Sequence, residues 1–230
     1  MEEKINFVDG MSTWELGVKR CSDFCGALLL LIIFLPLILF IWISLWFEHE
    51  GSPVFKQERI GYKGKPFYIY KFRTMRKDAE NGVPQLAQVH DKRLTSLGRF
   101  LREHHLDELP QMWNVLVGDM SLVGPRPEVR HYVNYWTTEQ MHVLDVRPGI
   151  TDPASIKFRN ENELLAQAED PEKYYIEVIM QEKIKSYLDY VEKNNFWYDN
   201  NRIEYKIDGV GKKDKNEKKN SNCTRGECFR

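Results

Sequence analysis

Two adjacent carboxylates, Asp107 and Glu108, stand just before Pro110 in the stretch LDELPQ. Proline is accepted in the first turn of a helix, because its missing N–H would have no intrahelical partner there. The pair is therefore predicted at a helix start, where unpaired amides and the helix dipole favour negative charge. We expect Asp107 to stay ionised, with oxygens available to an electrophile or a metal ion. The flanking arginines are Arg99, Arg102 and Arg126.

A carboxylate among guanidinium groups suits a reaction on a phosphate ester. Arginine binds phosphate oxygens through paired hydrogen bonds, and an anionic nucleophile needs a neutralised target. The short motif alone is more typical of a capped helix with surface ion pairs. The longer context favours chemistry, because the motif continues through WNV at residues 113–115 and GDMSLVGPRP at residues 118–127.

These motifs together resemble the core of the bacterial monotopic polyprenyl-phosphate phosphoglycosyl transferases, over roughly residues 17–200. The resemblance implies transfer of a sugar 1-phosphate from a UDP-sugar to polyprenyl (undecaprenyl) phosphate, with release of UMP. It implies catalytic roles for Asp107 as nucleophile, for Glu108 and for Arg102, with Mg²⁺ held at Asp107 and Glu108. This would be the first membrane step of bacterial surface polysaccharide or glycoconjugate assembly.

Other cations are predicted to bind the substrates. In the stretch KFRTM, Lys71 and Arg73 alternate along one face of a predicted strand and could reach one anion together. An ordinary solvated strand face is the alternative. Arg126 lies between two prolines and is held on a stiff, extended segment. The predicted substrate-binding set is Lys71, Arg73, Pro125, Arg126, Pro127, Arg147 and Arg159.

A long apolar segment runs from Phe24 to Phe47 without a charged residue. As a helix it would measure about 36 Å, against a hydrocarbon core of about 30 Å. Basic residues flank both ends, and the positive-inside rule would place both flanks in the cytoplasm. Pro36 lies at the midpoint, so we predict a re-entrant hairpin that breaks there and returns to the same leaflet. A kinked spanning helix is the alternative. The phosphoglycosyl transferase family that this sequence resembles likewise has one re-entrant helix and a cytoplasmic catalytic domain.

The elements around these residues can be placed from periodicity and turn signals. Strands are predicted over 53–61 and 67–73, joined by a turn at 62–66 into a hairpin. A helix is predicted from about Leu94 to Arg102, which delivers Arg102 toward the acidic pair. Thr137 or Thr138 is expected to open a short helix, and two helices, broken at Asp170-Pro171, are predicted over 161–194.

Composition bounds the partners and the architecture. A net charge of −1 over 230 residues indicates no nucleic-acid partner. The four cysteines have no zinc-site spacing and are predicted to be reduced thiols. We expect a helix-rich α/β (α+β) catalytic domain over 48–205, an interfacial segment over 1–23, the re-entrant helix over 24–47 and a disordered basic tail over 206–230. The catalytic domain is expected on the cytoplasmic face of the bacterial inner membrane. The protein could also form homo-oligomers.

Two alternatives come from other functional classes. A catalytically silent membrane scaffold of a glycan assembly complex would not need the acidic pair, which is present. A hydrolase that uses two carboxylates as acid and base would need them about 5 to 9.5 Å apart across a glycosidic bond, which adjacent residues at one helix end do not provide.

Overall fold

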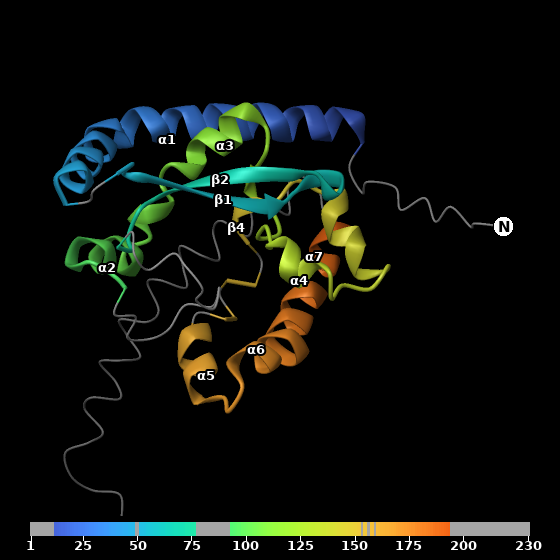
Figure 1. Ribbon diagram of the computed structural model, residues 1–230. Helices are drawn as coiled ribbons and strands as arrows, with labels where there is room; N and C mark the ends of the chain where they lie inside the picture. The colour runs from blue at the N-terminus through green and yellow to red at the C-terminus, as the bar shows by residue number, and fades with distance from the viewer. Residues whose placement is uncertain are drawn as a thin grey trace, which may run out of the picture.

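The computed structural model describes residues 12–48, 51–76, 93–152, 154–155, 157–158 and 160–193. Arg159 and the predicted tail at 206–230 lie outside the described residues, as do residues 1–11 of the predicted N-terminal segment. Within them the fold is a helix-rich mixture of α and β structure with two small sheets and one long apolar helix (Figure 1). The predicted helix-rich α/β class is confirmed at this level.

The long helix α1 runs from Thr13 to Glu48 without interruption. Its 36 residues correspond to about 54 Å. Ser12 and Glu15 open it as a reciprocal cap, in which each accepts a hydrogen bond from the other's backbone N–H. Pro36 lies inside the helix and cannot donate to the carbonyl one turn earlier, yet the helix continues through it. Figure 1 shows α1 curving toward the domain in its C-terminal part, but the helix is not broken at Pro36 as predicted.

The predicted hairpin is confirmed. Strands β1 (Val54–Ile60) and β2 (Pro66–Phe72) pair antiparallel, with Val54 opposite Phe72 and Ile60 opposite Pro66. A short 3₁₀ turn, η1 (Tyr62–Gly64), joins them with Lys63 and Gly64 at positive φ. A second, parallel pair was not predicted from sequence: β3 (Ser121–Val123) lies beside β4 (Gly149–Thr151).

Three short helical elements lie between the two sheets along the chain. Helix α2 (Ser96–Glu103) starts at Thr95, whose hydroxyl accepts from the Gly98 N–H at 2.9 Å. The 3₁₀ turn η3 (Leu106–Glu108) follows, and α3 (Gln111–Val117) begins after Pro110. Gly98 lies against the strand that leads to Thr74, because a Cβ there would fall 2.1 Å from the Thr74 carbonyl oxygen.

The region from residue 130 to residue 193 supplies most of the largest hydrophobic cluster in the described chain. It comprises α4 (Arg130–Val133), the 3₁₀ turn η4 (Gln140–Asp145), α5 (Glu161–Gln167), α6 (Pro171–Tyr174), the π-helical segment η5 (Tyr175–Ile179) and α7 (Met180–Lys193). Thr137 and Gln140 cap each other's N–H groups, and η4 begins three residues after Thr137, so Thr137 leads into the predicted short helix. The predicted break at Asp170-Pro171 is also confirmed, and the Asp170 carboxylate caps α6.

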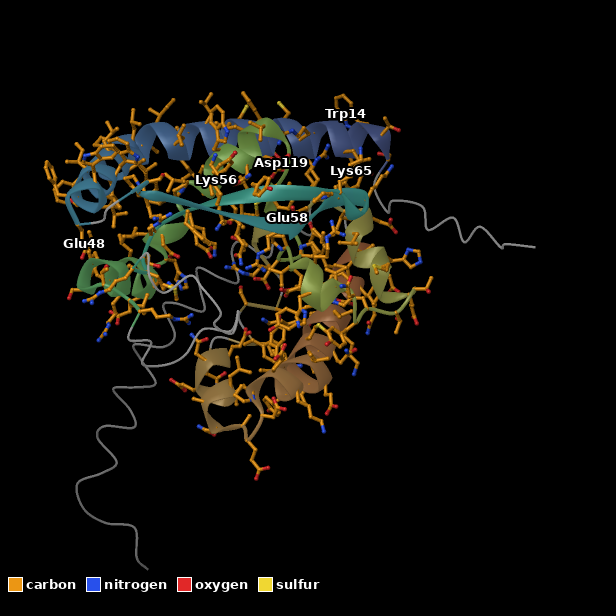
Figure 2. The ribbon with its side chains drawn as sticks, viewed as in Figure 1. Trp14, Glu48, Lys56, Glu58, Lys65 and Asp119 are labelled. Atoms are coloured by element: carbon orange, nitrogen blue, oxygen red, sulfur yellow. The ribbon has the colours of Figure 1, made fainter. Side chains whose placement is uncertain are left out.

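Helix α1 is attached to this domain near both ends. Near its start, Arg20 donates to the carbonyls that end α3, at 2.6 and 2.8 Å, and buried Asp23 accepts from Ser121 Oγ at 2.7 Å. Near its end, Ile41 and Leu45 are buried in one cluster with Phe72 and Leu101. The last residue, Glu48, accepts from Thr95 Oγ1 at 3.2 Å, and Figure 2 shows it beside the start of α2.

The remaining surface of α1 is apolar and exposed. Its exposed large apolar side chains within the predicted membrane segment are Phe24, Leu28, Leu29, Ile32, Ile33, Leu35, Leu39, Phe40, Trp42, Ile43, Trp46 and Phe47. Figure 2 shows a row of side chains along the face of α1 turned away from the domain, with Trp14 near its start. A continuous apolar surface of this kind is typical of a contact with lipid. By length and composition α1 is also the one described helix that could cross a membrane.

Candidate active site

The acidic pair lies in η3, directly before α3, so the predicted placement at a helix start is realised through a separate 3₁₀ turn. His105 precedes the turn in the left-handed region, with φ at 55°. This conformation lets the chain reverse after α2 and direct Asp107 inward. The two carboxylates then meet different surroundings, since Asp107 is 8% exposed and the Glu108 side chain faces two cations.

Glu108 is held by cations from two distant elements. Lys71 Nζ on β2 donates to its Oε1 at 2.9 Å, and the forked guanidinium of Arg126 reaches both of its carboxylate oxygens. The Glu108 side chain is only 14% exposed. Burial opposes its charge, but Arg126 and Lys71 outweigh burial and hold the pKa of Glu108 well below its usual range. Glu108 is therefore a fixed anion.

Asp107 is different, because its oxygens are uncommitted. No hydrogen bond or ion pair between described residues uses the carboxylate of Asp107. Burial raises its pKa, the charge of Lys71 lowers it, and the neighbouring Glu108 raises it further. A buried carboxylate without hydrogen-bond donors is less stabilised as an anion. Because its charge is less stabilised, it is a stronger nucleophile.

The cations around the pair are themselves positioned by neighbours. Burial lowers the pKa of Lys71 despite the attraction of Glu108. Arg102 Nε donates to Thr74 Oγ1 at 2.9 Å, and Arg102 acts electrostatically on Asp107, so α2 does bring Arg102 to the site as predicted. The close packing of Gly98 against Thr74 keeps α2, and with it Arg102, at this distance.

Arg126 projects from a segment that is neither helix nor strand, as the two flanking prolines predicted. Backbone pairs hold the start of this segment: Gly124 N–H donates to the Thr151 carbonyl at 3.0 Å, and Gly149 N–H donates to the Pro125 carbonyl at 2.8 Å. A Cβ on Gly149 would lie 2.1 Å from the Gly124 nitrogen, so only glycine permits this approach.

Two other predicted substrate cations, Arg73 and Arg147, make their contacts away from the acidic pair. Arg147 donates from Nε to the Gly118 carbonyl at 3.1 Å, and its guanidinium lies 5.4 Å from the centre of the Tyr62 ring. Arg73 pairs its backbone N–H with Pro53 and extends its guanidinium toward Gly51. No described contact joins either arginine to the acidic pair. Arg159 lies outside the described residues.

The donor set for a metal ion is small. No group of three or more His, Cys, Asp or Glu side chains capable of holding a metal occurs in the described part of the chain. Mg²⁺ commonly binds through one or two carboxylates plus substrate phosphates and waters. Asp107 and Glu108 fit that pattern, with Asp107 as the uncommitted ligand, and they do not form a cage of protein ligands alone.

Comparison with known proteins adds the family. The profile of the bacterial sugar transferases matches residues 14–210. The chain belongs to this family. It is 41% identical over 142 residues to a UDP-N-acetylgalactosamine-undecaprenyl-phosphate N-acetylgalactosaminephosphotransferase of Aeromonas hydrophila, which covers 60% of this chain and 34% of the relative.

Two further relatives are named UDP-glucose:undecaprenyl-phosphate glucose-1-phosphate transferase. The one from Escherichia coli K12 is 35% identical over 186 residues, with 79% of this chain and 38% of the relative covered. The one from Caulobacter vibrioides is 36% identical over 185 residues, with 79% and 65% covered. The chain thus spans between about a third and two thirds of the length of these relatives. Their names differ in the sugar and agree on the lipid phosphate.

Several residues that build the site were missed from sequence. Asn114 is fully buried and ties α3 to β2, because its side chain accepts from the Tyr70 N–H and donates to the Tyr68 carbonyl. Glu128 and Arg59 form an ion pair behind Arg126. Glu128 directly follows the GPRP motif, and this adjacency was the one signal that could have marked it.

Proposed function

We propose that this protein transfers a sugar 1-phosphate from a UDP-sugar to polyprenyl (undecaprenyl) phosphate, giving polyprenyl-diphosphate-sugar and UMP. The observation that carries the proposal is the division between the two carboxylates: Asp107 has uncommitted oxygens, while Glu108 is locked between Lys71 and Arg126. One group is suited to attack and the other to organise positive charge around the reacting phosphate. The names of the relatives support the donor class and the acceptor.

The proposed reaction proceeds in two displacements at one phosphorus. A carboxylate oxygen of Asp107 attacks the sugar-linked phosphorus of the UDP-sugar, the bond from that phosphorus to the bridging oxygen breaks, and UMP leaves with the electron pair. A phosphate oxygen of the polyprenyl phosphate then attacks the same phosphorus and releases the Asp107 carboxylate. Covalent catalysis of this type replaces one difficult displacement by two easier ones.

The cations have a defined task in this scheme. Arg126 and Lys71 can share their hydrogen bonds between Glu108 and the incoming phosphate oxygens. Arg102 acts electrostatically on Asp107 and adds positive charge beside the pair. Mg²⁺, held by Asp107 or Glu108 together with the donor diphosphate, would neutralise diphosphate charge and polarise the phosphoryl oxygens. Glu108 keeps the cations in place before the substrate arrives, which preorganises the site.

We also propose that α1 is monotopic and re-entrant. The apolar run begins next to Asp23 and ends at Glu48, and both ends are bonded to the same globular domain. A helix that crossed the bilayer would separate its ends by the thickness of the hydrocarbon core, about 30 Å. The domain would then lie on one membrane face, which the flanking basic residues assign to the cytoplasm. In a bacterial inner membrane this is the side that holds UDP-sugars.

The experiment uses purified full-length protein with a panel of UDP-sugars and Mg²⁺. Without lipid, the wild type should release up to one equivalent of UMP and carry a sugar phosphate on a peptide that contains Asp107. Addition of polyprenyl phosphate should remove the adduct and permit turnover. Asp107→Asn should abolish both the adduct and turnover, since it keeps the shape and loses the nucleophilic charge. An adduct mapped to Glu108, or full turnover by the Asn variant, contradicts the assignment. EDTA should stop UMP release if Mg²⁺ is required.

A further inference from the structure

A second charged cluster lies directly behind Arg126. Glu128 accepts from three donors: Arg59 Nη1 at 3.2 Å, the Val129 N–H at 3.0 Å and the Tyr175 hydroxyl at 2.8 Å. These donors come from β1, from the chain after the GPRP motif and from the π-helical segment η5. The Arg59 and Glu128 side chains are 20% and 18% exposed, and Tyr175 is buried. We call Arg59, Glu128 and Tyr175 the rear cluster.

The rear cluster fixes the end of the segment that bears Arg126. Arg59 Nη1 also donates to the Pro127 carbonyl at 3.3 Å, and the Ile60 N–H donates to the Glu128 carbonyl at 2.9 Å. The start of the segment is fixed separately by the Gly124 and Gly149 backbone bonds. The segment that bears Arg126 is therefore fixed at both of its ends. Backbone hydrogen bonds hold its start, and side chains of the rear cluster contribute to holding its end.

The rear cluster also neutralises the positive charge of Arg59 beside Arg126. Arg59 and Arg126 are like charges close enough to repel, and burial together with this repulsion lowers the pKa of Arg59 against the attraction of Glu128. Glu128 compensates the charge of Arg59. Without Glu128, the uncompensated charge of Arg59 would repel Arg126 and disturb the forked contact between Arg126 and Glu108.

Stability alone does not account for this arrangement. A buried ion pair is often no more stable than apolar residues of the same volume. Arg59 Nε is buried without a hydrogen-bond partner in the described part of the chain, a state that costs free energy. The segment that presents Tyr175 is a π-helix, a rare conformation that is frequent at functional sites. Three unfavourable features converge on one carboxylate next to the arginine of the active site.

We propose that Glu128, with Arg59 and Tyr175, positions Arg126 for the donor phosphate. Glu128 and Tyr175 are positioning residues that act through Arg126 and touch no substrate. This inference rests on the proposed function for its kinetic test, and it has a second test that does not.

The kinetic test is a double-mutant cycle on UMP release from the UDP-sugar that the wild type uses best. Glu128→Gln removes the charge and keeps the shape, and it should lower kcat/KM for the donor by about 10- to 100-fold, the scale of a misplaced binding group. Tyr175→Phe removes one hydrogen bond to a charged acceptor and should cost about tenfold. In the Arg126→Lys background, Glu128→Gln should cost less than threefold, because the residue it positions is already compromised.

Tyr132→Phe is the matched control. The Tyr132 ring lies 4.8 Å from that of Tyr175 and is also buried, but its hydroxyl is not among the donors to Glu128 in the described chain. Its kcat/KM should stay within twofold of the wild type. Losses that multiply in the double variant, or a Glu128→Gln protein with lowered Tm and unchanged kcat/KM, overturn the proposal.

Hydrogen exchange of the substrate-free protein separates this inference from the proposed function. Glu128→Gln should raise exchange in peptides covering residues 124–129, and leave residues 96–103 of α2 unchanged. If the wild type releases no UMP from any UDP-sugar, the proposed function fails and this measurement still decides the positioning role. Unchanged exchange at 124–129, or an equal rise in α2, refutes it.

Discussion

Replacement of Glu108 by glutamine should destabilise the protein measurably, because Glu108 is the shared counter-ion of Lys71 and Arg126. Removing one partner of a fully buried ion pair costs about 3–5 kcal/mol. Here the Arg126 side chain is 41% exposed and is partly screened by water. We therefore expect a loss of about 1–3 kcal/mol in the free energy of unfolding, which corresponds to a decrease in Tm of about 2–10 °C.

This deficit should depend on pH in a defined direction. The pKa of Glu108 in the folded protein lies well below its usual 4.5. The ionised carboxylate therefore stabilises the fold fully above pH 4.5, and its contribution is lost as the pH falls toward the folded-state pKa. The difference in Tm between wild type and Glu108→Gln should be largest near pH 7 and should shrink between about pH 5 and pH 3.

The assay is thermal unfolding in detergent micelles over this pH range. Glu177→Gln is the control, because Glu177 is 61% exposed and its contact with Lys173 is 4.0 Å long. Its stability should remain within about 0.5 kcal/mol of the wild type. Equal Tm values for the Glu108 and Glu177 variants, or a Glu108 deficit that does not change with pH, would refute the role of Glu108 as a buried counter-ion.

Two further predictions concern packing and topology. Gly98→Ala should destabilise the protein by about 1–3 kcal/mol and reduce UMP release, because the new methyl group would meet the Thr74 carbonyl and displace α2. Gly17→Ala is the control: Gly17 lies on α1 with open space around it, so this change should be neutral or stabilising by up to about 1 kcal/mol. Equal effects of the two substitutions on thermal unfolding would contradict the packing argument. Cysteines introduced at Ser12 and Ser52, in a background without native cysteines, should both react with an impermeant thiol reagent from the cytoplasmic side; reaction from opposite sides would show that α1 spans the bilayer.

Local rules accounted for much of the fold. The hairpin followed from alternation and from the Gly64 and Pro66 turn signals. The cap at Thr137 and the break at Asp170 followed from capping chemistry, which acts over three or four residues. The apolar run predicted a membrane helix, but its continuity through Pro36 did not follow. A proline removes one hydrogen bond, and packing of Ile41 and Leu45 on the domain stabilises the helix beyond it.

By itself, the sequence determined that a carboxylate pair stands among arginines, on a domain that follows a long apolar segment. The tertiary structure alone decided how the two carboxylates differ. Lys71 and Arg126 lie 37 and 18 residues from Glu108 along the chain, and they meet it through the β1–β2 hairpin and the β3–β4 contact. Local periodicity reaches only about four residues, so it cannot tell which of two adjacent acids such distant cations will bind. Long-range packing makes Glu108 the fixed anion and leaves the oxygens of Asp107 uncommitted.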